Sequence, residues 1–537
     1  MSGATLSQPA GLAPRQGPNL DAKPHASVGI VFLCLLVFGL GYTVNGLMHD
    51  INDAGGPTLA IGAFVLLGVA LLIALGFEFV NGFHDTANAV ATVIYTHSLP
   101  AQVAVIWSGF FNFLGVLTSS GAVAFTIVSL LPVELILQVG SGAGYAMIFA
   151  LLIAAIIWNL GTWALGLPAS SSHTLIGSII GVGLANELLN RGSGVSGVDW
   201  GQVWGVFKAL LVSPIVGFLG AGALLLAMKA VIKSKALYSA PDANRPPPVW
   251  IRGLLILTCT GVSFAHGSND GQKGMGLIML ILIGVAPTAY ALNRALPDSG
   301  TPAFIENTQK AEAVFSSHAN GIAVPADQAR GIVTAAIRDK SFDKPEVFGA
   351  LTSLAHDMGR QVQEHGSIAR VPAEVVQNVR NDMYLASESL RVMAKQGIKF
   401  GDTEGPALAN WKGGLDSGTK FIPLWVKVAV ALGLGTMIGW KRIVVTVGER
   451  IGKTHLTYGQ GAAAEVVAML TIGAADVYGL PVSTTHVLSS GVAGTMAANG
   501  SGLQWSTVWS IAMAWVLTLP AAALLAGVLY IAFRQVF

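Results

Sequence analysis

A polar stretch at residues 77–92 interrupts an apolar part of the sequence, and its polar side chains include Glu78, Asn81, His84, Asp85 and Asn88. A charge in an apolar segment is costly, so such a stretch indicates a functional site. Carboxylate oxygens bind hard cations such as sodium, and a buried carboxylate can instead carry a proton. We therefore expect a coupling ion, a substrate, or both at this stretch.

A second stretch at 263–275 repeats this pattern. Asp270 stands in the place of Asp85, and Lys273 stands in the place of Asn88. Lys273 could form a structural ion pair with Asp270 or contact an anion, and the sequence leaves both interpretations open. The two stretches also contain Gly82, Gly267, Gly271 and Gly274. These glycines allow the backbone to unwind at membrane depth, and unwound carbonyl oxygens together with the carboxylates would suit a hard cation such as sodium.

Two further segments begin with proline followed by hydroxyl residues and histidine. They read PASSSHTLIG at 168–177 and PVSTTHVLSS at 481–490, and each leads into an apolar stretch. Helices begin in this way, because hydroxyls cap the first turn while free N–H groups and the helix dipole attract an anion. Capping explains either segment alone, but two in register favour an anion site. The hydroxyl residues are Ser170, Ser171, Ser172, Ser483, Thr484 and Thr485.

Each of these four segments also contains one histidine: His84, His173, His266 and His486. They lack the i, i+4 spacing of zinc ligands, so hydrogen bonding is the simpler interpretation and no metal-ligand set is defined. Glu465 and Asp476 lie in the apolar span before the second Pro-Ser segment. They could serve ion coupling or pair with a neighbouring helix.

The composition indicates an all-α polytopic membrane protein. The 537 residues are 53% hydrophobic and 11% charged, with a mean hydropathy of +0.63, whereas soluble domains carry about 25% charged residues. Apolar segments predict about 10 to 12 transmembrane helices, some of them broken or re-entrant. The longer segments lie at about 28–48, 59–80, 103–130, 143–166, 203–232, 251–286, 422–440, 458–480 and 506–533, and shorter ones at 174–189 and 486–498.

The chain is duplicated, and its second half carries an insertion. Asp85 and Asp270 are 185 residues apart, whereas Pro168 and Pro481 are 313 apart. Residues 290–420 hold 14 of the 30 Lys and Arg and 15 of the 28 Asp and Glu, which indicates a soluble insertion. Its spacing predicts helices at 303–318, 326–340, 345–365 and 372–395. The predicted parts are a disordered tail at 1–27, a first transmembrane helix and loop at 28–58, repeat 1 at 59–250, the start of repeat 2 at 251–290, the helical insertion at 291–420 and the remainder of repeat 2 at 421–537.

Basic residues predict which loops face the cytoplasm. Lys and Arg flank apolar spans at 229–252 and at 441–453, so the positive-inside rule places both segments in the cytoplasm. The insertion then lies outside if 251–286 crosses the membrane once, and inside if that segment is re-entrant. Repeats that meet at a midplane site are typical of secondary transporters, and the number of intervening spans decides whether they are parallel or inverted.

The motifs resemble those of the inorganic phosphate transporter (PiT) family, and especially of its bacterial low-affinity permeases. The likeness rests on GFHDTANAVAT at 82–92, HGSNDGQKG at 266–274, PASSSHTLIG at 168–177 and PVSTTH at 481–486. It covers about 60–290 and 420–537. It implies an inverted-repeat fold and phosphate symport driven by H⁺ or Na⁺, and in the bacterial permeases uptake of phosphate as a neutral complex with a divalent metal.

The resemblance also implies roles for individual residues. Substrate binding would fall to Asp85, Asn88, Asn269, Asp270, Ser170, Ser171, Ser172, Ser483, Thr484 and Thr485. We place the coupling ion at Asp85, Asp270, Asn81, Glu78 and Lys273. The paired signature is Asn-Asp, but the first copy has His84 before Asp85, which favours protons over sodium.

We therefore expect a secondary active symporter that imports inorganic phosphate across a bacterial inner membrane, coupled to H⁺, with Mg²⁺ or another divalent cation accompanying phosphate. A sodium-coupled symporter and a carrier of another oxyanion or of divalent cations are the alternatives. A membrane-embedded phosphatase would need one asymmetric nucleophile and base, and an ion channel would need a continuous pore. We expect contact with lipid, no covalently bound cofactor and no nucleic-acid partner, and a homodimer stays open.

Overall fold

The computed structural model describes residues 18, 20, 26–55, 61–191, 198–242, 245–434 and 439–537, and it contains no strand within these ranges. Most of the predicted tail at 1–27 lies outside the described residues. The membrane part is built from α1 (Ala26–Asp53), α2 (Ile61–Tyr95), α3 (Ala101–Thr118), α4 (Ala122–Val128), α5 (Val133–Leu137), α6 (Gly142–Ala164), α7 (Ser171–Leu189), α8 (Trp200–Val231), α9 (Val249–Val285), α10 (Pro287–Tyr290), α16 (Leu424–Leu434), α17 (Lys441–Val445), α18 (Tyr458–Val477), α19 (Thr484–Ala498) and α20 (Trp505–Phe533).

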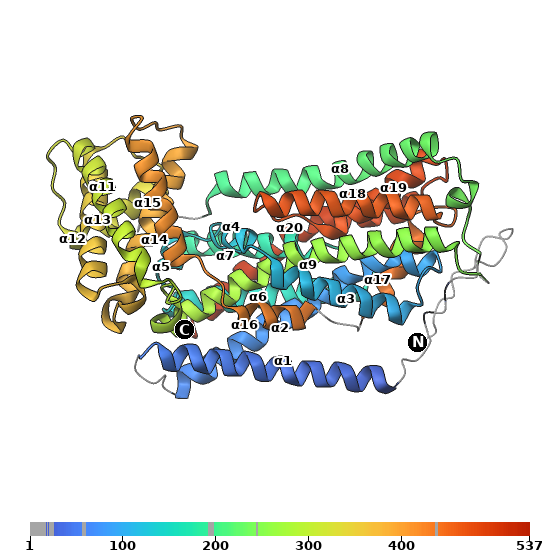
Figure 1. The fold of residues 1–537 in the computed structure, drawn as a ribbon, viewed down its shortest axis with the longest axis horizontal. Coiled ribbons are helices and arrows are strands. Elements are labelled where there is room, and N and C mark those ends of the chain that lie inside the picture. Colours follow the sequence, from blue (N-terminus) through green and yellow to red (C-terminus); the bar gives the residue numbers. More distant parts are fainter. Residues whose placement is uncertain are drawn as a thin grey trace.

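Eight of the described helices are long and apolar enough to cross a membrane: α1, α2, α3, α6, α8, α9, α18 and α20. These helices run roughly parallel to one another in Figure 1. The prediction of an all-α polytopic membrane protein is confirmed. The predicted span at 103–130 is wrong as a single helix, because Gly121 adopts a φ of 87° and separates α3 from α4.

Helices α2 and α9 carry the two aspartate stretches and cross antiparallel at close range. A Cβ built on Gly274 of α9 would lie 2.1 Å from the Glu78 carboxylate of α2. Farther along α2, Asp85 lies 4.0 Å from His266, which is earlier on α9. Residue numbers therefore rise along α2 as they fall along α9. Such antiparallel crossing of corresponding helices is what an inverted repeat requires, and the inverted repeat itself stays a prediction.

The glycines of the aspartate stretches do not unwind the backbone, so this part of the sequence interpretation is wrong. Both α2 and α9 continue as helices through Asp85 and Asp270. The glycines of α9 instead allow close helix packing, since a Cβ on Gly267 would lie 2.1 Å from the Asn112 carbonyl oxygen of α3. The breaks in the helices occur at 165–170 and 478–483, and each includes the first three residues of a Pro-Ser segment.

The short helix of each half packs against the long helix of the other half. In α7, a Cβ on Gly181 would lie 1.9 Å from the Ala523 carbonyl oxygen of α20. In α19, the corresponding Gly494 would place a Cβ 2.0 Å from the Phe218 carbonyl oxygen of α8. Glycine is therefore needed at both crossings. The packing of α7 on α20 and of α19 on α8 holds the two short helices in the centre of the membrane part.

The insertion forms a separate helical bundle at one end of the membrane part (Figure 1). It contains α11 (Thr301–His318), α12 (Ala326–Asp339), α13 (Pro345–His365) and α14 (Ala373–Lys395), which lie where helical spacing predicts them. A further helix, α15 (Glu404–Thr419), was not predicted. The bundle contacts the start of α8, because Lys340 lies 3.1 Å from Asp199, the N-cap of that helix.

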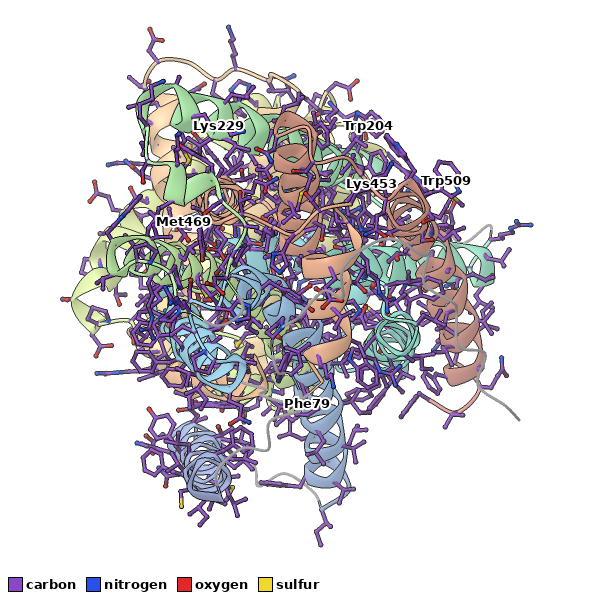
Figure 2. The ribbon with its side chains drawn as sticks, turned by 90° about the vertical axis from the view of Figure 1, so that its right-hand side faces the viewer. Phe79, Trp204, Lys229, Lys453, Met469 and Trp509 are labelled. Carbon is purple, nitrogen blue, oxygen red and sulfur yellow. The ribbon has the colours of Figure 1, made fainter. Side chains whose placement is uncertain are left out.

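The basic segments lie at the other end of α8. Lys229, in the last turn of α8, donates a hydrogen bond to the Asn499 side chain, and the backbone N–H of Lys453 donates to the Gly502 carbonyl oxygen. Figure 2 views the molecule from this end and labels both lysines. The insertion and the two basic segments therefore occupy opposite ends of the membrane helices.

Candidate functional site

The two Pro-Ser segments begin their helices as predicted. The Ser170 Oγ accepts a hydrogen bond from the backbone N–H of His173 at 3.2 Å, and the Ser483 Oγ accepts from His486 at 3.1 Å. Ser170 and Ser483 are thus the N-caps of α7 and α19. Their hydroxyl oxygens are already engaged by their own helices, so of the six predicted hydroxyls these two serve as caps.

The N-termini of α7 and α19 meet at Asp85. The Ser171 hydroxyl donates to Asp85 Oδ2 at 2.9 Å, and the Thr485 hydroxyl donates to Asp85 Oδ1. Asp85 is 2% exposed, and its two partners come from the first turns of helices in different halves of the chain. Since helix N-termini favour negative charge, one carboxylate occupies the point on which both converge.

Asp270 is bound by a lysine of its own helix. The Lys273 Nζ lies 2.6 Å from Asp270 Oδ1, so the predicted ion pair is present. Lys273 is fully buried and also donates to the Ser172 Oγ at 2.5 Å and to the Val482 carbonyl oxygen at 3.3 Å. It therefore links α9 to the first turn of α7 and to the segment that precedes α19.

His266 lies between the two aspartates. Its Nδ1 is 2.6 Å from Asn112 Oδ1, and the amide nitrogen of Asn112 donates to Ser108, so Asn112 fixes the orientation of the ring. The Nε2 then lies 3.5 Å from an Asp270 oxygen and 4.0 Å from an Asp85 oxygen. Ligand atoms of these three residues lie within 4.8 Å of one another, which suits a divalent cation. The i, i+4 spacing of His266 and Asp270 was the sequence signal for this cluster, and it was missed.

Other predicted site residues surround this centre. The Asn269 amide donates to the Leu480 carbonyl oxygen at 3.1 Å and accepts from the Val482 N–H at 3.5 Å, so it holds the non-helical segment before α19. Glu78 and Asn81 are fully buried, and their side chains have no hydrogen-bond partner among the described atoms.

Thr484 and Asn88 complete the predicted set. Thr484 is 1% exposed, and its hydroxyl has no hydrogen-bond partner in the described part of the chain. It lies next to Thr485 in the first turn of α19. Asn88 belongs to α2, and its side chain lies outside the described residues.

The remaining histidines do not join the carboxylate cluster. The rings of His173 and His486 lie 4.4 Å apart, and His486 packs on Trp515 at 4.0 Å. His84 Nε2 lies 3.2 Å from the Thr162 hydroxyl. Of the four histidines, His266 alone lies within 4.0 Å of a carboxylate in the described structure.

Two further buried or half-buried carboxylates connect helices near the centre. Glu465 of α18 accepts hydrogen bonds from Thr92 of α2 and Thr258 of α9. Asp476, also on α18, accepts from the Gln272 amide of α9 at 2.6 Å. Both acids are therefore hydrogen-bonded to neighbouring helices, which is one of the two alternatives that the sequence left open.

A buried polar site at the starts of two short helices, inside a polytopic helical protein, is typical of a membrane transporter. The sequence matches the Phosphate transporter family over residues 81–526, and the chain belongs to this family. The predicted family membership is confirmed.

Its relatives agree with this assignment. The chain is 44% identical over 481 residues to the low-affinity inorganic phosphate transporter PitA of Escherichia coli K12, covering 87% of this chain and 96% of that protein. It is 42% identical over 503 residues to PitB of the same organism, covering 88% and 98%. A solved structure described as the sodium-dependent phosphate transporter aligns with a TM-score of 0.47 at 20% identity, over 88% of this chain and 100% of that one. The family and the names of PitA and PitB confirm the prediction of a transporter and not an enzyme.

Proposed function

We propose that this protein imports inorganic phosphate across a bacterial inner membrane, in symport with protons or as a neutral complex with a divalent cation. The observation that carries the proposal is the position of Asp85, which is hydrogen-bonded to the first turns of both α7 and α19. Two helix N-termini directed at one point form an anion site without arginine. The names of the relatives make phosphate the expected anion.

The Asp85 carboxylate and phosphate compete for the same donors. A polyanion is repelled by this carboxylate until a proton or a cation neutralises it. Hydrogen phosphate then has an advantage over sulfate, because its own O–H can donate a charge-assisted hydrogen bond to a carboxylate. Sulfate at neutral pH has no such proton, so its contact with Asp85 would be repulsive. The same group would thus select the substrate and couple its entry to a cation.

The cluster of Asp85, His266 and Asp270 supports a divalent cation as co-substrate. Asn112 holds the His266 imidazole at Nδ1, so Nε2 is directed toward both carboxylates and could serve as a ligand. These three residues would leave coordination positions around Mg²⁺ free for phosphate oxygens and water.

Sodium is less well supported than protons or a divalent cation as the coupling ion at the aspartate stretches. Sodium coordination there was expected to use carbonyl oxygens of unwound backbone. Both α2 and α9 are continuous at Asp85 and Asp270, so these carbonyls belong to helical hydrogen bonds. We therefore propose protons or a divalent cation, with sodium as the alternative.

The orientation of the protein follows from the same helices. The basic segments at 229–252 and 441–453 share one end of the molecule, which the positive-inside rule assigns to the cytoplasm. Helix α9 crosses once between that end and the insertion. We propose that the insertion faces the outer side, where substrate enters.

Uptake of labelled phosphate by proteoliposomes tests this proposal. We expect accumulation when the outside is more acidic than the inside, a further increase with external Mg²⁺, and no requirement for sodium. A requirement for a sodium gradient at constant pH and Mg²⁺ would replace this mechanism with the sodium-coupled alternative. No uptake of phosphate under any of these gradients would contradict the proposal as a whole.

A further inference from the structure

A cavity with both apolar and charged side chains in its lining lies between the insertion and the membrane part. Its volume is about 290 Å³. Helix α14 contributes Arg380, Tyr384 and Arg391, and Lys420 follows α15. The membrane side is formed by α4 and α9, including Gly276. Three of the side chains around this space are therefore basic.

Arg380 is the least compensated of these basic groups. It is 4% exposed, and its Nη1 donates to the Ile136 carbonyl oxygen at 3.3 Å and to the Asn381 side chain at 3.1 Å. Its Nε has no hydrogen-bond partner in the described structure, and its guanidinium faces the Tyr384 ring, 5.3 Å from the ring centre, without an ion pair among the described residues. Burial lowers the pKa of Arg380 to about 10, so the group stays charged near neutral pH. A buried charge without a counter-ion is strongly unfavourable.

The neighbouring acids are already engaged by other cations. Glu388 pairs with Arg391, whose Nε donates to it at 2.8 Å. Asp416 lies 2.7 Å from Lys420 and 2.6 Å from Lys412, so one carboxylate serves two lysines. Among the residues that line the cavity, three are basic and Glu388 alone is acidic, so the lining carries a surplus of positive charge beside the unpaired Nε of Arg380. A bound anion would balance this charge and accept a hydrogen bond from the Arg380 Nε.

We propose that this cavity binds a phosphate group, at a site separate from Asp85, with Arg380 as its principal ligand. A guanidinium binds phosphate oxygens through a planar set of donors, and Lys420 adds a second charge. The phosphate group can come from free phosphate or from the headgroup of an anionic lipid, since the cavity lies where the insertion meets the membrane helices. The inference does not depend on the coupling mechanism proposed above.

The cavity is adjacent to the central site along α9. Gly276 lines the cavity, and Lys273 of the central site precedes it by three residues, a rise of about 4.5 Å along the helix axis. With the insertion on the outer side, free phosphate bound here would be held beside the site that it enters next. The proposed site thus gives the insertion a role in collecting substrate.

Equilibrium dialysis with labelled inorganic phosphate and the purified full-length protein tests this site. We expect two phosphates per chain in the parent and one in Arg380→Gln. Arg360→Gln is the matched control, because Arg360 is an exposed arginine of the same insertion, paired with Asp357 and Glu364, and it should keep two. Ser171→Ala should weaken the central site alone, so failure of the central site is distinguished from failure of this one.

Native mass spectrometry separates the two sources of the phosphate group. If a lipid headgroup occupies the cavity, the parent should retain an anionic phospholipid that Arg380→Gln loses, with one free phosphate bound in both proteins. If neither phosphate nor phospholipid binding differs between the parent and Arg380→Gln, the proposal is overturned.

Two milder variants keep the test decisive if Arg380→Gln does not fold. Arg380→Lys retains the charge but not the planar donors, and Lys420→Gln removes the second charge. Each should weaken binding of the second phosphate, or of the phospholipid, by about tenfold, as expected for loss of a charge-assisted hydrogen bond. Binding equal to that of the parent in both variants would also overturn the proposal.

Discussion

Asp85 and Asp270 occupy corresponding positions in the two halves of the chain, but their surroundings differ. Asp85 accepts hydrogen bonds from Ser171 and Thr485, which belong to two other helices. Asp270 is paired with Lys273, one turn away on its own helix. Asp85 therefore has neutral partners that can release it, whereas Asp270 has a fixed counter-ion. The position three residues after the aspartate differs in the same way, with Asn88 in the first stretch and Lys273 in the second.

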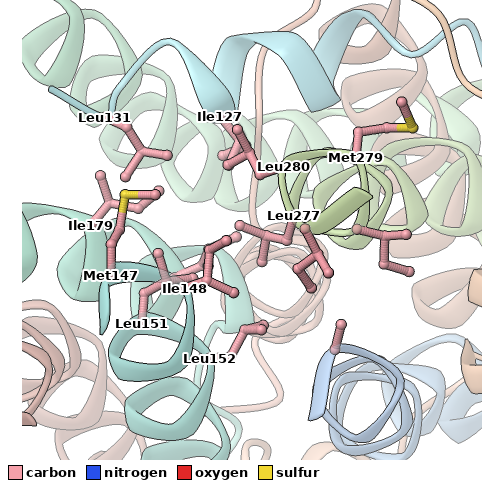
Figure 3. Close-up of a cluster of buried hydrophobic side chains, with 14 of the residues drawn as sticks. Ile127, Leu131, Met147, Ile148, Leu151, Leu152, Ile179, Leu277, Met279 and Leu280 are labelled. Atoms are coloured by element: carbon pink, nitrogen blue, oxygen red, sulfur yellow. The ribbon is translucent and has the colours of Figure 1, made fainter. Parts of the chain in front are cut away.

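A second set of corresponding positions also differs between the two halves. Glu465 accepts from Thr92 and Thr258, and the positions that correspond to Glu465 and Thr92 in the other half are Leu152 and Leu277. Figure 3 shows Leu152 and Leu277 within one cluster of apolar side chains. One architecture thus accommodates either a carboxylate with two hydroxyls or a purely apolar contact, because the helix crossing is the same and only the side chains differ.

The largest effect is expected from Asp85→Asn. The amide can still bond to both hydroxyls, so the fold should persist, but it cannot carry a proton or neutralise a cation. Gradient-driven accumulation of phosphate in proteoliposomes should be abolished, and the difference between phosphate and sulfate binding should narrow. A variant that still concentrates phosphate and excludes sulfate would show that Asp85 is structural.

The second prediction concerns the ion pair between Asp270 and Lys273. Asp270→Asn leaves Lys273 charged and buried, so stability should fall by about 3–5 kcal/mol in thermal unfolding of the detergent-solubilised protein. Adding Lys273→Asn, which gives this helix the residue of the first copy, should restore most of the loss. Equal stability of the single and double variants would contradict a structural ion pair.

The third prediction makes one half resemble the other. Glu465→Leu removes the acceptor of Thr92 and Thr258, so stability should fall by about 1–2 kcal/mol, the net value of two hydrogen bonds. Phosphate accumulation should be retained. Retained stability together with lost accumulation would instead assign Glu465 to ion coupling.

The smallest effects are expected from single hydroxyls at the helix starts. Ser171→Ala and Thr484→Ala should each weaken phosphate affinity by about 1 kcal/mol, or roughly fivefold, because each removes one buried hydroxyl that could donate a hydrogen bond to phosphate. Ser510→Ala, an exposed serine of α20, is the control. Unchanged affinity in both site variants would remove the hydroxyls from the anion site.

Several features could be predicted from sequence because they depend on composition or on nearby residues. Low charge and high hydropathy identified a membrane protein. The helix starts after Pro168 and Pro481 were predictable because an N-cap such as Ser170 bonds three residues along the chain. The ion pair of Asp270 and Lys273 was one of two open interpretations, since it spans a single helical turn.

Tertiary structure decided the contacts that define the site. Ser171 is 86 residues from Asp85 and Thr485 is 400 residues from it, so no local pattern could assign these hydroxyls to that carboxylate. Packing also decided that the glycines serve close helix crossings and not unwinding, because a Cβ on Gly267 would meet the backbone of α3. The sequence by itself determined which groups are present and where helices begin. Only the crossing of α2 with α9, and the convergence of α7 and α19, determined which of those groups meet.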